Sequence, residues 1–170
     1  MLFRSFSTSG KAAQDLRSAR NKLSKLGYRI EFHQPPLPSF LVEELRLVSD
    51  AWLRLMKGSE KRFSVGWFDE TYLRESLLAL VRAPDGSIGA FANVLSPAPA
   101  QSAAIDLMRY RAQMPHGTMD FLFLALIEHC REQGCERFYL GLSALAGVGE
   151  EPRSARIERV VHRSEEHTSE

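Results

Sequence analysis

A charged pair, Asp106 and Arg109, follows the apolar run Ala103-Ala104-Ile105 and precedes a polar loop. Acyl transfer needs a nucleophile positioned against an activated carbonyl, and a place for negative charge. The carboxylate of Asp106 can accept a proton from an attacking hydroxyl or hold an ammonium group, and the guanidinium of Arg109 can bind a phosphate through paired hydrogen bonds. The pattern predicts a catalytic pair where a strand opens into a loop. The structural alternative is that Asp106 fastens the loop to backbone amides and Arg109 forms a surface ion pair with it.

The loop after this pair, residues 110–117, supplies further candidates. Arg111, His116 and Gly117 would line a cleft at the start of the next helix, whose free amide groups can face an anion. The loop has one glycine and lacks the Arg/Gln-x-x-Gly-x-Gly/Ala form that holds a pyrophosphate, so coenzyme A is disfavoured. The alternative for His116 is a solvated side chain. Ser64 lies beside Gly66 and Trp67; the family resemblance described below implies a substrate-binding role for it, and the alternative is a plain turn serine.

Other chemistries find no support in the sequence. None of the five histidines has a carboxylate or cysteine partner at a recognisable spacing, which disfavours a Ser-His-Asp nucleophile, and no metal constellation is present. Cys130 and Cys135 fit no zinc or redox motif and are expected to be reduced thiols. No apolar run approaches the roughly 18–20 residues that a transmembrane helix requires.

Basic residues gather at the start of a chain whose net charge is only +1. This clustering suggests that the first helix contacts an anionic partner, either tRNA or an acidic lipid surface. The alternative is an ordinary solvated helix face. The residues that would make this contact are Lys11, Arg17, Arg20, Lys22 and Lys25.

The elements that would position these residues follow from hydrophobic spacing and from turn residues. Ser39 is expected to cap the second helix and Asp69 a short third one. Three successive strands suggest an antiparallel meander, to which a later helix returns the chain. The predicted helices cover 11–26, a segment from 39 to about 55, 69–75 and 118–133, and the predicted strands cover 28–32, 77–81, 88–95, 103–108 and 137–142.

Three segments closely resemble the C-terminal catalytic domain of the phosphatidylglycerol lysyltransferases, the multiple peptide resistance factor family. They are Phe63-Ser64-Val65-Gly66-Trp67-Phe68-Asp69, Ile88-Gly89-Ala90-Phe91-Ala92-Asn93, and the stretch from Ile105 to Phe123, and order and spacing match from about Gly10 to Gly149. Residues 142–147 depart from the family's usual run, which puts any substrate role of that loop in doubt. The resemblance implies an α/β (α+β) fold of the Gcn5-related acyltransferase type, with a mixed, mainly antiparallel sheet flanked by helices.

The same resemblance implies a function. It is the transfer of an amino acid, expected to be lysine, from aminoacyl-tRNA to a glycerol hydroxyl of phosphatidylglycerol, with no metal or nucleotide cofactor. The expected location is the cytoplasmic face of the bacterial plasma membrane, with a membrane-embedded domain upstream in the parent protein. Two alternatives stay open: another acyltransferase of this fold, using acyl-CoA or building peptidoglycan cross-bridges, or a non-catalytic module that binds lipid or RNA.

The two ends of the chain are interpreted separately. Residues 1–10 are expected to be a poorly ordered start, and residues 11–162 a C-terminally incomplete acyltransferase-like domain. Residues 163–170 match the in-frame translation of a sequencing-adapter oligonucleotide and are interpreted as an artefact. The 170-residue chain alone is therefore expected to be inactive.

Overall fold

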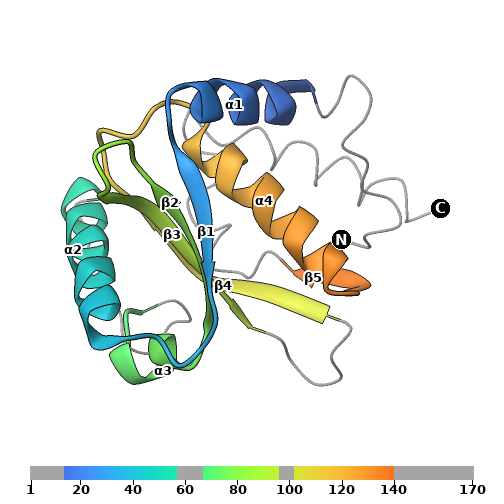
Figure 1. The fold of residues 1–170 in the computed structure, drawn as a ribbon. Helices are drawn as coiled ribbons and strands as arrows, with labels where there is room; N and C mark the ends of the chain where they lie inside the picture. The colour runs from blue at the N-terminus through green and yellow to red at the C-terminus, as the bar shows by residue number, and fades with distance from the viewer. Residues whose placement is uncertain (1–13, 57–66, 96–101, 140–170) are drawn as a thin grey trace.

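The computed structural model describes residues 14–56, 67–95 and 102–139 (Figure 1). The elements in chain order are α1 (Gln14–Lys25), β1 (Arg29–His33), α2 (Ser39–Leu55), α3 (Glu70–Arg74), β2 (Leu77–Arg82), β3 (Ile88–Leu95), β4 (Ser102–Tyr110), α4 (Thr118–Glu132) and β5 (Arg137–Tyr139). Every predicted element in this part of the chain is present, with ends that shift by a few residues. The interpretations of residues 1–10 and 163–170 concern segments outside the described residues.

The five strands form one sheet in the order β1-β2-β3-β4-β5. Strands β1 to β4 are an antiparallel meander, and β5 pairs with β4 in parallel after the α4 crossover. This is the predicted mixed, mainly antiparallel sheet.

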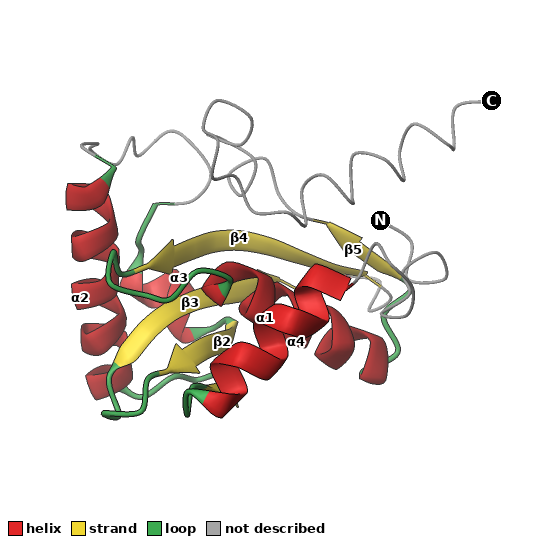
Figure 2. Ribbon diagram, turned by 90° about the horizontal axis from the view of Figure 1, so that it is seen from above, coloured by secondary structure: helices red, strands yellow, loops and turns green. Residues whose placement is uncertain are grey.

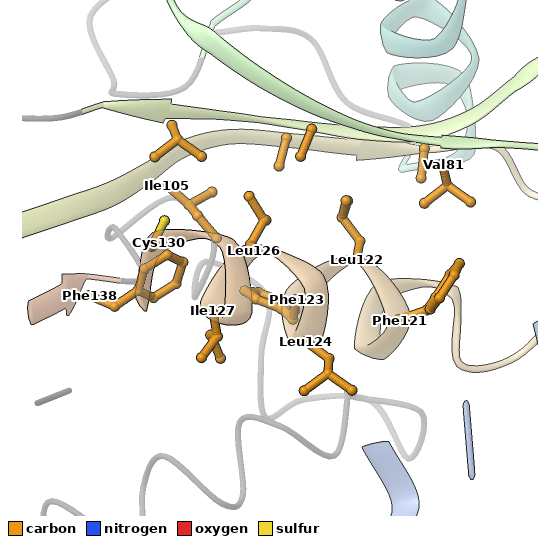
Figure 3. Close-up of a cluster of buried hydrophobic side chains, with 14 of the residues drawn as sticks. Val81, Ile105, Phe121, Leu122, Phe123, Leu124, Leu126, Ile127, Cys130 and Phe138 are labelled. Atoms are coloured by element: carbon orange, nitrogen blue, oxygen red, sulfur yellow. The ribbon is translucent and has the colours of Figure 1, made fainter. Parts of the chain in front are cut away.

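Helices cover both faces of the sheet (Figure 2). On one face, side chains of α1 and α4 form a core with alternate residues of β2, β3 and β4. On the other face, side chains of α2 and α3 pack on the intervening residues of the same strands. In Figure 3, Leu122 and Leu126 of α4 point toward the strands that carry Val81 and Ile105. Full burial of one such side chain stabilises the fold by about 1.5–3 kcal/mol.

Two predicted helix caps have different outcomes. The Asp69 side chain accepts a hydrogen bond from the Tyr72 amide at 2.9 Å, so this cap is confirmed. The prediction for Ser39 is wrong, because Pro38 occupies the cap position and Ser39 is the first residue of α2. The Ser39 hydroxyl instead accepts a hydrogen bond from Arg74 at 2.9 Å, which ties α2 to α3.

Strand β4 contains a β-bulge. Val94 pairs with Ile105 and Ala92 pairs with Met108, so that two residues of β4, Asp106 and Leu107, oppose the single residue Asn93. The strand then continues to Tyr110. The predicted placement of the charged pair at the strand end is therefore wrong for Asp106, which lies at the bulge.

None of the helices in the described residues is long and apolar enough to span a membrane.

Candidate active site

The carboxylate of Asp106 is buried at the bulge of β4. Its residue is only 7% exposed, and Oδ1 has no hydrogen-bond partner among the described residues. The Tyr72 phenol, from α3, lies beside this carboxylate and interacts with it electrostatically. Because a buried carboxylate oxygen without a partner is costly, its persistence in a folded domain points to an acceptor held ready for a ligand.

Tyr72 reaches the bulge from a short helix whose start is fixed by the Asp69 cap. Burial raises the pKa of the Tyr72 phenol, and the hydrogen bond to Asp106 and the charge of Asp106 raise it further. A hydrogen bond from Asn93 acts in the opposite direction. The phenol therefore stays protonated at neutral pH, beside the Asp106 carboxylate.

Arg109 lies further along β4 and is also buried, at 5% exposure. Its guanidinium carbon lies 3.8 Å from the centroid of the Trp52 ring of α2, a cation–π contact. Arg109 is therefore not the surface side chain that the structural alternative expected. The Trp52 ring holds the Arg109 cation on the α2 side of the sheet.

These residues come together on the α2/α3 side of the sheet and define what we term the bulge cluster. It combines a carboxylate acceptor, a phenol donor, a carboxamide and a cation, a set that can take up a proton and balance negative charge. The sequence alone did not indicate Trp52, Tyr72 or Asn93, since their contacts join different elements. The bulge cluster consists of Trp52, Tyr72, Asn93, Asp106 and Arg109.

The candidates from the loop lie elsewhere. The Arg111 side chain donates to the Ile88 carbonyl at 2.9 Å, which fastens the loop to β3. His116 and Gly117 line a small pocket of about 150 Å³ between α1 and the start of α4, with Asp15, Ser18, Ala19, Lys22 and Asp120. This pocket is on the α1/α4 side of the sheet, so the structure does not bring His116 and Gly117 together with Asp106. Ser64 lies outside the described residues.

The basic residues of α1 are in different environments. Arg20 forms an ion pair with Glu128 of α4 at 3.1 Å, and Arg17 is half-buried. Lys22 and Lys25 are exposed, and Lys11 lies outside the described residues. Two of the five predicted contact residues are therefore displayed to solvent on the described part of α1.

The cysteines and potential metal ligands offer no second site. Both thiols are free, and burial, followed by the neighbouring Cys135, raises the pKa of Cys130 to about 12. Across residues 14–56, 67–95 and 102–139, no three His, Cys, Asp or Glu side chains are grouped as a metal site would require.

Comparison with known proteins shows which family the chain matches. Over residues 1–170 the chain matches a family model described as "Phosphatidylglycerol lysyltransferase, C-terminal". It is 38% identical over 144 residues to a phosphatidylglycerol lysyltransferase of Bacillus subtilis (strain 168), covering 85% of this chain and 17% of the relative. A Staphylococcus xylosus protein of the same name is 33% identical over 163 residues, covering 96% of this chain and 19% of that protein. The chain thus spans less than a fifth of the length of these curated relatives.

Solved structures give the same answer for the fold. The structure of L-PGS from Bacillus licheniformis matches with a TM-score of 0.75 and 37% identity, over 88% of this chain and 47% of that chain. A C-terminal (DUF2156) domain from Agrobacterium fabrum matches with a TM-score of 0.74 and 37% identity, over 82% of this chain and 44% of that chain. The predicted α/β fold, with a mixed, mainly antiparallel sheet flanked by helices, is confirmed.

Proposed function

Because the chain belongs to the phosphatidylglycerol lysyltransferase C-terminal family, we propose that it takes part in transferring an amino acid from aminoacyl-tRNA to a glycerol hydroxyl of phosphatidylglycerol. The names of its relatives favour lysine as the amino acid. The reaction would take place at the cytoplasmic face of the plasma membrane and would need no metal or nucleotide cofactor.

One observation carries the proposal: the buried Oδ1 of Asp106, which has no partner among the described residues, beside a phenol that stays protonated. In the proposed reaction the lipid hydroxyl attacks the ester carbonyl of the aminoacyl group, and Asp106 takes up the hydroxyl proton. A new ester bond forms to the lipid and the ester bond to the tRNA breaks. The departing tRNA oxygen takes the proton from Asp106 and leaves as a hydroxyl, which restores the carboxylate. Arg109, held against Trp52, balances negative charge on phosphate or on the reacting oxygen.

The proposal is tested in the context of a full-length relative. The segment of the Bacillus subtilis protein that matches this chain is replaced by the chain, and membranes containing the chimera are given radiolabelled lysyl-tRNA and phosphatidylglycerol vesicles. We expect labelled lipid that migrates as lysyl-phosphatidylglycerol, with no competition by coenzyme A. A folded chimera that forms no aminoacyl lipid would contradict the proposal, and inhibition by coenzyme A would favour the acyl-CoA alternative.

A further inference from the structure

We propose that Asn93 is a positioning residue that places the Asp106 carboxylate, and that it acts by holding the β-bulge of β4. The inference rests on the proposed function, because it assigns a role within the same site. It adds a residue that touches neither the lipid nor the aminoacyl group in the proposed reaction.

The bulge decides which side chains share a face. In a regular strand, residues three positions apart point to opposite faces of the sheet. Asp106 and Arg109 have this spacing, yet Asp106 meets Tyr72 of α3 and Arg109 meets Trp52 of α2, on the same side. The extra residue in β4 makes this possible. Without it, Asp106 and Arg109 would lie on opposite faces, and one of them would point toward the α1/α4 core, where Ile105, Met108 and Tyr110 pack.

Asn93 supplies the hydrogen bond that a bulge otherwise leaves unmade. It is fully buried on β3, opposite the two bulged residues, and its Oδ1 accepts the Leu107 amide at 2.7 Å. The side chain thus takes the place of a backbone carbonyl of the ladder. An unsatisfied buried amide is costly, so loss of this acceptor would favour a regular register.

The nitrogen end of the same carboxamide reaches α3. Nδ2 donates to the Ser76 hydroxyl at 3.4 Å, and the carboxamide lies beside the Tyr72 phenol. Ser76 in turn donates to the Tyr72 carbonyl at 2.9 Å. One carboxamide therefore fixes the backbone beside Asp106 through its oxygen, and through its nitrogen it binds Ser76, which follows the helix that carries Tyr72.

Two variants separate these actions. Asn93→Leu keeps the approximate shape and removes both hydrogen-bonding groups. Asn93→Asp keeps an acceptor for the Leu107 amide, removes the donor to Ser76 and adds a negative charge close to Asp106. The matched control is Ser49→Ala, since Ser49 is a buried polar residue of α2 whose hydroxyl has no partner among the described residues.

The first measurement is amide hydrogen exchange in the 170-residue chain, which needs no activity. In Asn93→Leu we expect the protection factor of the Leu107 amide to fall at least tenfold, measured relative to the amides of Ile105 and Met108. In Asn93→Asp and Ser49→Ala we expect the Leu107 protection factor to stay unchanged. Equal protection of Leu107 in all variants would overturn the role of Asn93 in the bulge.

The second measurement is transfer by the chimera as a function of pH. We expect Asn93→Leu to lower kcat by a factor of about 10–100 with KM for lipid little changed, and Ser49→Ala to stay within about twofold. Asn93→Asp should move the acid limb of the pH profile to higher pH, because added negative charge favours the protonated form of Asp106. A merely structural residue would lower the amount of folded enzyme without moving the profile.

The outcomes distinguish the two proposals. Normal kcat in Asn93→Leu, or an unmoved profile in Asn93→Asp, would overturn the positioning role and leave the proposed function intact. If Asn93→Leu does not fold, Asn93→Asp decides alone. A folded, unsubstituted chimera without transfer would refute the proposed function, whatever the exchange at Leu107.

Discussion

Asp106 and Arg109 offer the most direct test at the scale of single residues. Asp106→Asn removes the proton acceptor, and Arg109→Ala removes the cation above Trp52. In the chimera we expect each to lower transfer by about 100-fold, equivalent to about 2.7 kcal/mol of transition-state stabilisation. The control is Asp85→Asn, a fully exposed carboxylate in the turn between β2 and β3. Folded variants with near-normal rates would place the site elsewhere, and variants that unfold would make the pair structural.

The ionisation of Tyr72 gives a second residue-scale prediction. Its pKa is raised in the folded state, chiefly by burial, so the stabilising effect of the neutral phenol is fully present below the unfolded pKa of about 10. This stability is lost as pH rises through the higher folded value. We expect Tyr72→Phe to flatten the alkaline fall in unfolding free energy, measured by urea denaturation between about pH 9 and 12. An identical alkaline fall in both proteins would show that Tyr72 titrates normally.

The sequence revealed only part of this site, for a physical reason. A charge within an apolar strand is conspicuous, which is why the sequence indicates Asp106 and Arg109 as candidates. Spacing alone would put these two residues on opposite faces, and the bulge that unites them depends on a side chain of β3. Tyr72 had one available signal, its place in the first turn after the Asp69 cap, but nothing in the sequence indicates its distance from Asp106.

At the scale of elements, the long periodic segments were the most predictable. The apolar spacing of α2 and α4 and the turn between β2 and β3 gave elements whose ends agree closely with the structure. The prediction that Ser39 caps α2 was wrong because the Ser39 hydroxyl has an alternative partner in Arg74, which only the tertiary structure brings near. Strand β4 was predicted too short because Arg109 and Tyr110 are polar or amphipathic residues that are covered by α2 and by the α1/α4 core.

The start of α4 gives an element-scale prediction about packing. Gly117 and Gly134 flank α4 with φ values of 92° and 81°, conformations that cost a residue with a side chain about 1–2 kcal/mol. A Cβ on Gly117 would lie 3.0 Å from the Ala19 Cβ of α1, whereas a Cβ on Gly134 would meet nothing within 4 Å. We therefore expect Gly117→Ala to destabilise the protein more than Gly134→Ala, by on the order of 1 kcal/mol.

Thermal melting of the two glycine variants measures this difference. An additional 1 kcal/mol corresponds to a Tm about 2–4 °C lower for a domain of this size. Equal melting temperatures would mean that α1 moves away from α4 at little cost, and that the contact at Ala19 does not hold the two helices in register.

At the scale of the whole molecule, the predicted functional residues divide between the two faces of the sheet. The bulge cluster lies on the α2/α3 side, while α1 and its exposed lysines lie on the α1/α4 side (Figure 2). A polyanion held by α1 would thus approach the domain from the side opposite the bulge cluster.

The last prediction tests whether α1 contacts such a polyanion. Lys22→Glu and Lys25→Glu together should weaken binding of tRNA, and the salt dependence should become shallower by about 0.9 in log–log slope for each lysine that contacts a phosphate. The matched control is Arg54→Glu, which reverses an exposed charge on α2, on the other side of the sheet. Affinities are measured by fluorescence anisotropy from about 50 to 200 mM salt, with phosphatidylglycerol vesicles titrated in parallel.

Weaker tRNA binding with unchanged vesicle binding would assign α1 to the nucleic acid, and the reverse pattern would assign it to the lipid. If the lysine variants change the affinities for tRNA and for vesicles no more than Arg54→Glu does, the basic residues of α1 are an ordinary solvated face. The role of Arg20 is then its ion pair with Glu128.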